Sequence, residues 1–147
     1  MAIVLTDPKV LAAKFLDTFN SHNESAIRSL VSPQIHFTAP GDVRLSGTDA
    51  FVGYLNGWLK AVPDARMTIR HEIVSGPWIV QEYTFEGTHK GTLAGPLGEI
   101  APTNKKIVGH GVQLSRFEND LLVDCRLYFD MVETLTQLGV MPVPARN

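Results

Sequence analysis

Long strands joined by turns fill the second half of the chain, and they limit the folds that the chain can adopt. Residues typical of strands cover about 65–75, 78–87, 106–117 and 121–129, and strands on either side of a short turn run antiparallel. The stretch between the middle two, GTHKGTLAGPLGEIAPTNKK, is rich in glycine and proline and shows no helical pattern. The sequence therefore predicts an antiparallel sheet as the main element of the fold.

Helical patterns gather in the first half of the chain and recur once at its end. Thr6 is expected to cap a first helix, and Asn23 a second, short one. A third helix, which ends before Pro63, has an apolar stripe that faces a core, and a closing helix covers about 131–138. Helices kept apart from an antiparallel sheet predict an α+β fold, here in one domain over residues 1–147.

Charge and composition argue against several classes of partner. The 13 Lys and Arg against 15 Asp and Glu give a net charge of −2, so we expect no binding to nucleic acid or to an anionic membrane surface. No run of about 18 apolar residues could cross a membrane, and the opening residues lack the length and basic leader of a signal peptide. The single cysteine, Cys125, forbids an intrachain disulfide and fits a core position in a cytoplasmic protein.

Motifs for cofactors and metals are missing from the sequence. There is no GxGxxG after a strand, no GxxxxGK[ST] and no GxSxG. The five histidines show none of the close spacings that metal sites use. We therefore expect a protein that uses neither a cofactor nor a metal.

Three segments of the second half carry a resemblance to a known family. They read GPWIVQEYTFEGTHKG, APTNKK and GHGVQLSRFENDLLVDCRLYFDMVETLTQLG. In this order and spacing they resemble the SnoaL-like polyketide cyclase and ester cyclase family, of the nuclear transport factor 2-like superfamily. The resemblance implies a cone-shaped, curved antiparallel sheet, a half-barrel closed by the N-terminal helices, with a C-terminal helix after the last strand. It also implies an apolar pocket inside the cone and a homodimer through the convex sheet face.

Two positions near the end of the last strand decide how far the chemistry of that family carries over. Asp130, with Glu133 three residues later, fits the capping pattern of a helix start. The resemblance places the aspartate that polyketide cyclases and limonene epoxide hydrolases use three residues before that cap, where this chain has Leu127. A leucine neither takes nor gives a proton, so the acid–base reaction of the family is not implied for this chain.

Strand alternation extends the pocket from this position along the same strand. If Leu127 points inward, Val123, Cys125 and Phe129 point inward as well. That face is entirely apolar, which suits a pocket wall.

The resemblance also supplies an expected inner face for the neighbouring strand. It points Gly109, Gly111 and Gln113 inward, with space for a ligand at the glycines and a polar anchor at Gln113, and leaves His110 in an outward dimer surface. The residues expected to bind a substrate are His36, Tyr54, Trp58, Gly111, Gln113, Leu127 and Phe129. For Tyr54, Trp58 and His36 a role in the core remains an open alternative.

Two patterns conflict on the strand at about 78–87. Hydrophobicity alone buries Tyr83 with Ile79 and Phe85. The resemblance to limonene epoxide hydrolases instead places the other face inside, with Glu86 as the candidate catalytic residue. A glutamate in an apolar pocket has a raised pKa and can act as a general acid or base, whereas on a solvated face it does neither. Both faces remain possible at this point.

These features support three functions of different kinds. The first is a polyketide cyclase-like enzyme, an isomerase, lyase or hydrolase that acts without a cofactor on a small hydrophobic carbonyl, ester or polyketide-like substrate, with Glu86 as proton carrier and Gln113 as hydrogen-bond donor. The second is a non-catalytic protein that binds a hydrophobic ligand on the same fold, as Leu127 suggests. The third is a dimer whose role is contact with a protein partner.

Overall fold

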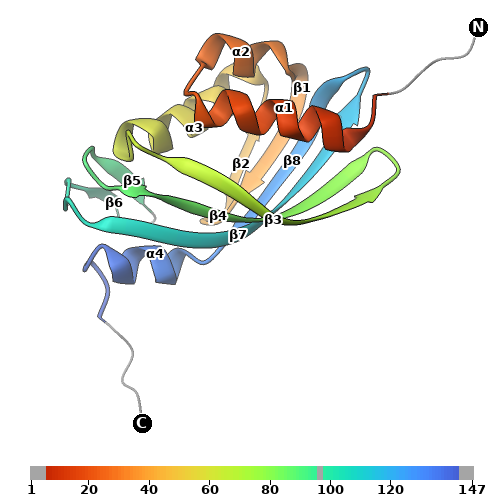
Figure 1. Ribbon diagram of the computed structural model, residues 1–147. Helices are drawn as coiled ribbons and strands as arrows, with labels where there is room; N and C mark the ends of the chain where they lie inside the picture. Colours follow the sequence, from red (N-terminus) through yellow and green to blue (C-terminus); the bar gives the residue numbers. More distant parts are fainter. Residues whose placement is uncertain (1–5, 96–97, 143–147) are drawn as a thin grey trace, which may run out of the picture.

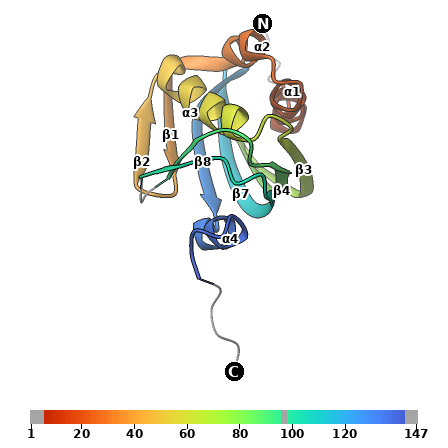
Figure 2. The same cartoon turned by 90° about the vertical axis from the view of Figure 1, so that its left-hand side faces the viewer.

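The computed structural model describes residues 6–95 and 98–142 and shows an α+β fold built on one large curved sheet (Figure 1). Its elements are α1 (Pro8–Asn20), α2 (Glu24–Ser29), β1 (Val31–Ala39), β2 (Val43–Ser46), α3 (Thr48–Ala61), β3 (Arg66–Ser75), β4 (Trp78–Thr88), β5 (Leu93–Gly95), β6 (Gly98–Ile100), β7 (Lys106–Glu118), β8 (Leu121–Phe129) and α4 (Met131–Gln137). The large sheet has the order β2-β1-β8-β7-β4-β3 and does not close into a barrel (Figure 2). Helices α1–α3 cover its concave side, and α4 follows the last strand. This is the predicted architecture.

One pairing in the sheet differs from the expected antiparallel pattern. β3, β4, β7 and β8 pair antiparallel in chain order, apart from the small β5–β6 ribbon that interrupts them. β1, in contrast, runs parallel to β8, with Phe37 opposite Cys125. The whole of α3 and β3–β7 lies between these two strands in the chain, which gives the long crossover that a parallel pair requires.

The main core lies between the concave face of the sheet and the helices above it. The ring of Phe37 in β1 meets the ring of Phe51 in α3 edge-on, with 5.0 Å between centroids, and Phe15 of α1 packs 6.1 Å from the same ring. Ile79 of β4 is fully buried beneath them. Because burial of each such side chain stabilises a fold by about 1.5–3 kcal/mol, these contacts fix the curvature of the sheet against α1 and α3.

A bulge in β8 changes which of its residues enter the core. The β7–β8 register shifts so that Phe117 pairs with Leu122. Leu122 is 1% exposed, whereas Val123 is only half-buried. The prediction that Val123 points inward is therefore wrong, because an extra residue in one strand reverses the alternation beyond it. Cys125, which follows the bulge in the chain, keeps its predicted core position.

Side-chain caps set the starts of three helices. The cap bonds run from Lys9 N to Asp7 Oδ1 at 2.9 Å, from Ala26 N to Asn23 Oδ1 at 3.1 Å and from Glu133 N to Asp130 Oδ1 at 3.0 Å. Asn23 and Asp130 thus act as caps as predicted. The first helix is capped by Asp7 rather than by Thr6, one residue later than expected.

Helix α4 covers the part of β7 that extends past the end of β8. The β7–β8 ladder ends where Gly111 meets Phe129. Beyond that point the Gln137 side chain bonds both main-chain groups of Val108, accepting from its N–H at 2.8 Å and donating to its carbonyl at 2.9 Å. Glu133 Oε1 accepts from the main-chain N–H of His110 at 3.2 Å. Two side chains of α4 therefore take the place of a neighbouring strand.

The connection between β4 and β7 closes one end of the cone. It contains the ribbon β5–β6, where the sequence indicated only a loop, and its Leu93 packs in a second cluster with Val62 and Leu138. The main-chain N–H groups of Lys90 and Gly91 both donate to Ala61 O at the end of α3, at 2.9 and 3.0 Å. A Cβ on Gly91 would lie 2.2 Å from Lys60 O, so this close approach requires glycine.

His89 holds the same connection from inside. Its ring is fully buried, and its Nδ1 accepts from the main-chain N–H of Thr103 at 3.2 Å and lies 2.9 Å from Thr103 Oγ1. Among the described residues Nε2 has no hydrogen-bond partner. An accepting Nδ1 requires the neutral ring, and burial is the main cause that lowers the pKa of His89, with the nearby Gly91 main chain acting in the opposite direction.

Two expectations concern the membrane and the start of the chain. Within residues 6–95 and 98–142, none of the helices combines the length and apolarity that crossing a bilayer requires. The expectation for the opening residues falls on positions 1–5, which lie outside the described residues.

Two alanine substitutions should have opposite effects on stability. Gly91→Ala should lower the free energy of unfolding by about 1–3 kcal/mol, because the added methyl meets backbone that cannot move aside. Gly57→Ala, on α3 with no atom within 4 Å of the new Cβ, should raise it by about 0.5–1 kcal/mol. Urea unfolding followed by circular dichroism measures both. Equal effects of the two substitutions would contradict the described packing of the connection on α3.

The stability of the protein should fall in acid through His89. Its folded-state pKa lies below its unfolded-state value of about 6.5, so the unfolded chain takes up the proton first. The contribution is full above the unfolded pKa and is lost as pH falls toward the folded one. We expect the urea midpoint to fall between about pH 7.5 and 5.5, and to fall less in His89→Gln. The exposed His36 provides the control, since His36→Gln should keep the wild-type pH dependence.

Candidate functional site

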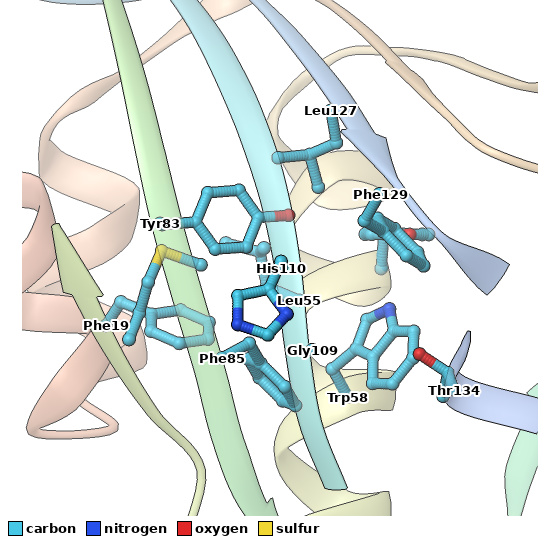
Figure 3. A pocket seen from close by; sticks show the side chains of 12 residues that line it. Phe19, Leu55, Trp58, Tyr83, Phe85, Gly109, His110, Leu127, Phe129 and Thr134 are labelled. Atoms are coloured by element: carbon cyan, nitrogen blue, oxygen red, sulfur yellow. The ribbon is translucent and has the colours of Figure 1, made fainter. Parts of the chain in front are cut away.

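A small apolar pocket lies between α3 and the concave face of β4, β7 and β8 (Figure 3). Its volume is about 50 Å³, and it is partly open rather than enclosed, so a ligand can extend beyond this space. It is lined by Phe19, Tyr54, Leu55, Trp58, Met67, Tyr83, Phe85, Gly109, His110, Leu127, Phe129 and Thr134. None of these residues carries a carboxylate, so the polar groups that reach the pocket are hydroxyls and an indole N–H.

Leu127 stands in the pocket wall on β8. It is half-buried and pairs with Gln113 of β7. Figure 3 shows its side chain beside Phe129 at the end of the pocket toward which the Tyr83 hydroxyl points. The position that the family resemblance assigns to an aspartate therefore faces the pocket and carries an aliphatic side chain here.

An aromatic wall joins α3 to the sheet. Trp58 meets Phe85 at 5.5 Å and Phe129 at 5.8 Å between ring centroids, both edge-on. Tyr54, one turn earlier on α3, packs at 4.8 Å against Phe37. Residues four apart on a helix share one face, and this face of α3 points into the cone. Tyr54, Trp58 and Phe129 thus line the pocket and belong to the packing around it at the same time.

Tyr83 occupies space that the sequence assigned to a ligand. A Cβ on Gly111 would lie 2.5 Å from the Tyr83 hydroxyl oxygen, so the phenol ring lies directly over this glycine. Gly111 faces inward, but the room that it leaves is filled by the protein itself. At Gly109 a Cβ would meet its nearest atoms at 3.8 and 3.9 Å, which is ordinary contact. Tyr83 was not among the expected site residues, although the hydrophobic alternation of its strand already indicated that it is buried.

Gln113 lies on the inner face of β7 beyond the pocket. It pairs with Gln81 on one side and Leu127 on the other, and its Nε2 donates to Ser115 Oγ at 3.2 Å. It is not among the residues that line the pocket. Its expected role as a ligand anchor would need a ligand that reaches past Leu127.

Two expected site residues lie outside the cone. Glu86 is on the outer face of β4, its side chain 44% exposed and its Oε2 4.0 Å from Lys106 Nζ. His36 is exposed on β1, with Nδ1 3.3 Å from Ser46 Oγ. The predictions that these side chains face the pocket are wrong, because Phe85 beside Glu86, and Ile35 and Phe37 on either side of His36, occupy the inner face of their strands.

Asp130 and His110 are both tied to α4. Asp130 caps the helix, and Glu133 does not reach back to complete a capping box. Its Oε1 instead lies 3.2 Å from Nδ1 of His110. The register places His110 opposite Thr84, on the face away from Tyr83, and its side chain is 56% exposed. We therefore attribute the contribution of His110 to the pocket lining to its main-chain atoms and not to its ring.

Burial keeps the acidic groups of the pocket in their neutral forms. It raises the pKa of Tyr83 and that of Tyr54, and for Tyr54 the neighbouring Trp58 side chain acts in the opposite direction. Burial also raises the pKa of the Cys125 thiol to about 12, which leaves this cysteine unreactive. At neutral pH both phenols are therefore hydrogen-bond donors. Among the described residues no three His, Cys, Asp or Glu side chains gather as metal ligands would.

Comparison with solved structures establishes the fold. AclR of Streptomyces galilaeus, provisionally named a hydroxylase, is 24% identical with a TM-score of 0.81, covering 95% of this chain and 89% of that one. IdmH of Streptomyces antibioticus, provisionally named a polyketide cyclase, is 22% identical with a TM-score of 0.78 and coverages of 92% and 100%. A protein of Jannaschia sp. CCS1, provisionally named a SnoaL-like polyketide cyclase, is 12% identical with a TM-score of 0.82 and coverages of 97% and 99%. At these identities the likeness concerns the fold alone.

The family follows from the sequence match. None of the curated proteins matches the chain significantly. The family model described as SnoaL-like polyketide cyclase matches residues 9–138, which run from the first turn of α1 to the end of α4. The segments that suggested this resemblance lie within the match, except for the final Gly139. The chain therefore belongs to the SnoaL-like polyketide cyclase family and has its nuclear transport factor 2-like fold.

Proposed function

We propose that the protein binds a small hydrophobic molecule that bears a carbonyl group, in the pocket under α3 and without a cofactor. The observation that carries this proposal is the lining of the pocket. Its walls are aromatic and aliphatic, a few hydroxyls reach it, and Leu127 supplies no proton. Such a site recognises shape and one or two polar atoms. It lacks the carboxylate to which the resemblance assigns the acid–base chemistry of the family.

Turnover of the same class of ligand is the second candidate. Membership of a family named for polyketide cyclases favours it. Glu86 cannot carry this chemistry from the outer face of β4. A catalytic role would therefore rest on the pocket hydroxyls, and a panel of carbonyl, ester and polyketide-like substrates separates turnover from simple binding. The lone buried cysteine supports a cytoplasmic location for either activity.

Filling the pocket should abolish binding. Leu127→Phe adds volume inside a cavity of about 50 Å³, and we expect it to weaken the binding of acetophenone at least about tenfold. Trp58 fluorescence in a Trp78→Phe background measures the dissociation constant, because Trp58 is then the only tryptophan and lines the site. Native mass spectrometry of freshly purified protein checks for a retained ligand.

The matched control lies at the far end of the same strand. Leu121→Phe makes the same change next to the turn before β8, away from the pocket lining. It should leave the affinity for acetophenone unchanged. If the two substitutions weaken binding equally, or if the wild-type protein binds no aromatic carbonyl compound, the pocket is not the binding site that we propose.

We also propose that the protein forms a homodimer through the outer face of the sheet. Apolar side chains run across this face, and two of them are strongly exposed, Ile73 at 67% and Tyr128 at 57%. The register brings Ile73, Val80 and Leu114 into one row across three strands. A contiguous apolar patch on a sheet face is typical of a protein interface.

A charge in the middle of this row should prevent association. Val80→Glu, between Ile73 and Leu114, is expected to convert a dimer into a monomer, because burial of an unpaired carboxylate costs several kcal/mol. Size-exclusion chromatography with light scattering gives the mass. Val10→Glu, a substitution of an exposed valine on α1, should leave the mass unchanged. A wild-type protein that is monomeric at high concentration would overturn the proposal.

A further inference from the structure

We propose that the hydroxyls of Tyr83 and Tyr54 together donate hydrogen bonds to the carbonyl oxygen of the ligand. The inference rests on the proposed binding function and makes it specific. It assigns a donor pair to the pocket and restricts the ligand class to molecules with a neutral ketone or similarly exposed carbonyl next to an apolar body.

The hydroxyl of Tyr83 is free to bond a ligand. Its ring is buried in the pocket wall, yet among the described residues no side chain or main-chain group bonds its hydroxyl. The same hydroxyl is not sealed within the core, since the buried unbonded groups are those of Thr84, His89 and Thr136. A hydroxyl held inside an apolar cavity without a partner is costly, so the pocket offers a donor that a ligand can satisfy.

The fold fixes the direction of the Tyr83 hydroxyl. The phenol lies over Gly111, and even a methyl group there would come within 2.6 Å of the ring carbon that bears the oxygen. Figure 3 shows the hydroxyl directed toward the side of the pocket formed by Leu127 and Phe129. The tyrosine and the glycine face each other in register on β4 and β7, so the position of the donor is set by two strands rather than by a loop.

A second hydroxyl, that of Tyr54, is present in the same pocket. Tyr54 lines the same pocket from α3, opposite the sheet that carries Tyr83. Among the described residues no protein group accepts a hydrogen bond from the Tyr54 hydroxyl, so its O–H is free to donate to a ligand in the pocket. Tyr83 and Tyr54 would then offer two donors to one ligand oxygen.

The chemistry of the pair selects an acceptor without its own charge. Both phenols are neutral because burial disfavours their ionised forms, so they donate and do not take up protons. A ketone oxygen accepts two hydrogen bonds and needs no counter-charge. A free carboxylate would lose its hydration in a cavity without a cation. Two donors on one carbonyl oxygen also polarise the C=O bond. The infrared C=O frequency of the bound ligand should therefore be lowered.

The experiment compares two ligands that differ only in the oxygen. 4′-Fluoroacetophenone and 1-ethyl-4-fluorobenzene have nearly the same shape, and fluorine NMR titration gives the affinity of each. The wild-type protein should prefer the ketone about three- to tenfold. In Tyr83→Phe this preference should shrink toward one, with the affinity for the ethyl compound unchanged. Infrared difference spectra of the carbon-13-labelled ketone should show a lowered C=O frequency in the wild type that returns toward the value in apolar solvent in the variant.

Two further variants and one control variant complete the test. Tyr54→Phe should remove part of the preference and part of the C=O shift, and Gly111→Ala should remove the preference by displacing the phenol of Tyr83. Tyr128→Phe deletes the hydroxyl of the remaining tyrosine, which is exposed on the opposite face of the sheet, and should leave both readouts at wild-type values. Thermal melts report whether each variant is folded.

The outcomes separate this inference from the function on which it rests. If the wild-type protein binds neither compound, the proposed binding function fails. If it binds both compounds equally, or if Tyr83→Phe and Tyr54→Phe both keep the preference and the C=O shift, binding stands and the donor pair is overturned.

Discussion

The alternation of side chains along β4 decides what the interior of the cone contains. Ile79, Gln81 and Tyr83 point inward and are buried, while Glu82 and Glu86 point outward, Glu82 toward His71 and Glu86 toward Lys106. A slip of one residue would exchange these sets. It would place two carboxylates in an apolar cavity and the aromatic rings in water, at a cost of several kcal/mol for each charge. The apolar character of the pocket is thus a consequence of the strand register and not of any single lining residue.

This register also explains where prediction from sequence succeeded and where it failed. The strand and helix patterns locate every long element to within a few residues, because hydrophobic periodicity reports burial directly. Glu86 was placed by likeness to another branch of the superfamily, and here local hydrophobicity, which favoured Tyr83 on the inner face, was the better guide. His36 failed for the same reason, since the buried Ile35 and Phe37 on either side leave its side chain outside.

Other features could not be read from one sequence at all. The bulge that replaces Val123 by Leu122 in the core depends on pairing between two strands, and a single-strand pattern contains no such information. The filling of the Gly111 position by Tyr83 requires contact across β4 and β7, which are linked only through the tertiary fold. Sequence reasoning therefore identified Gly111 as inward and could not tell that the protein itself occupies the space.

The side-chain bonds of α4 to β7 bear on how this protein can associate with other chains. An uncovered length of strand offers free N–H and C=O groups to any extended peptide, and this is the usual beginning of fibril growth. Gln137 occupies both groups of Val108, and Glu133 occupies the N–H of His110. Another polypeptide must break these bonds before it can pair with β7 at this position. The closing helix thus protects this length of β7 from strand addition, and fraying of its seven residues would expose unpaired main-chain groups next to the apolar pocket.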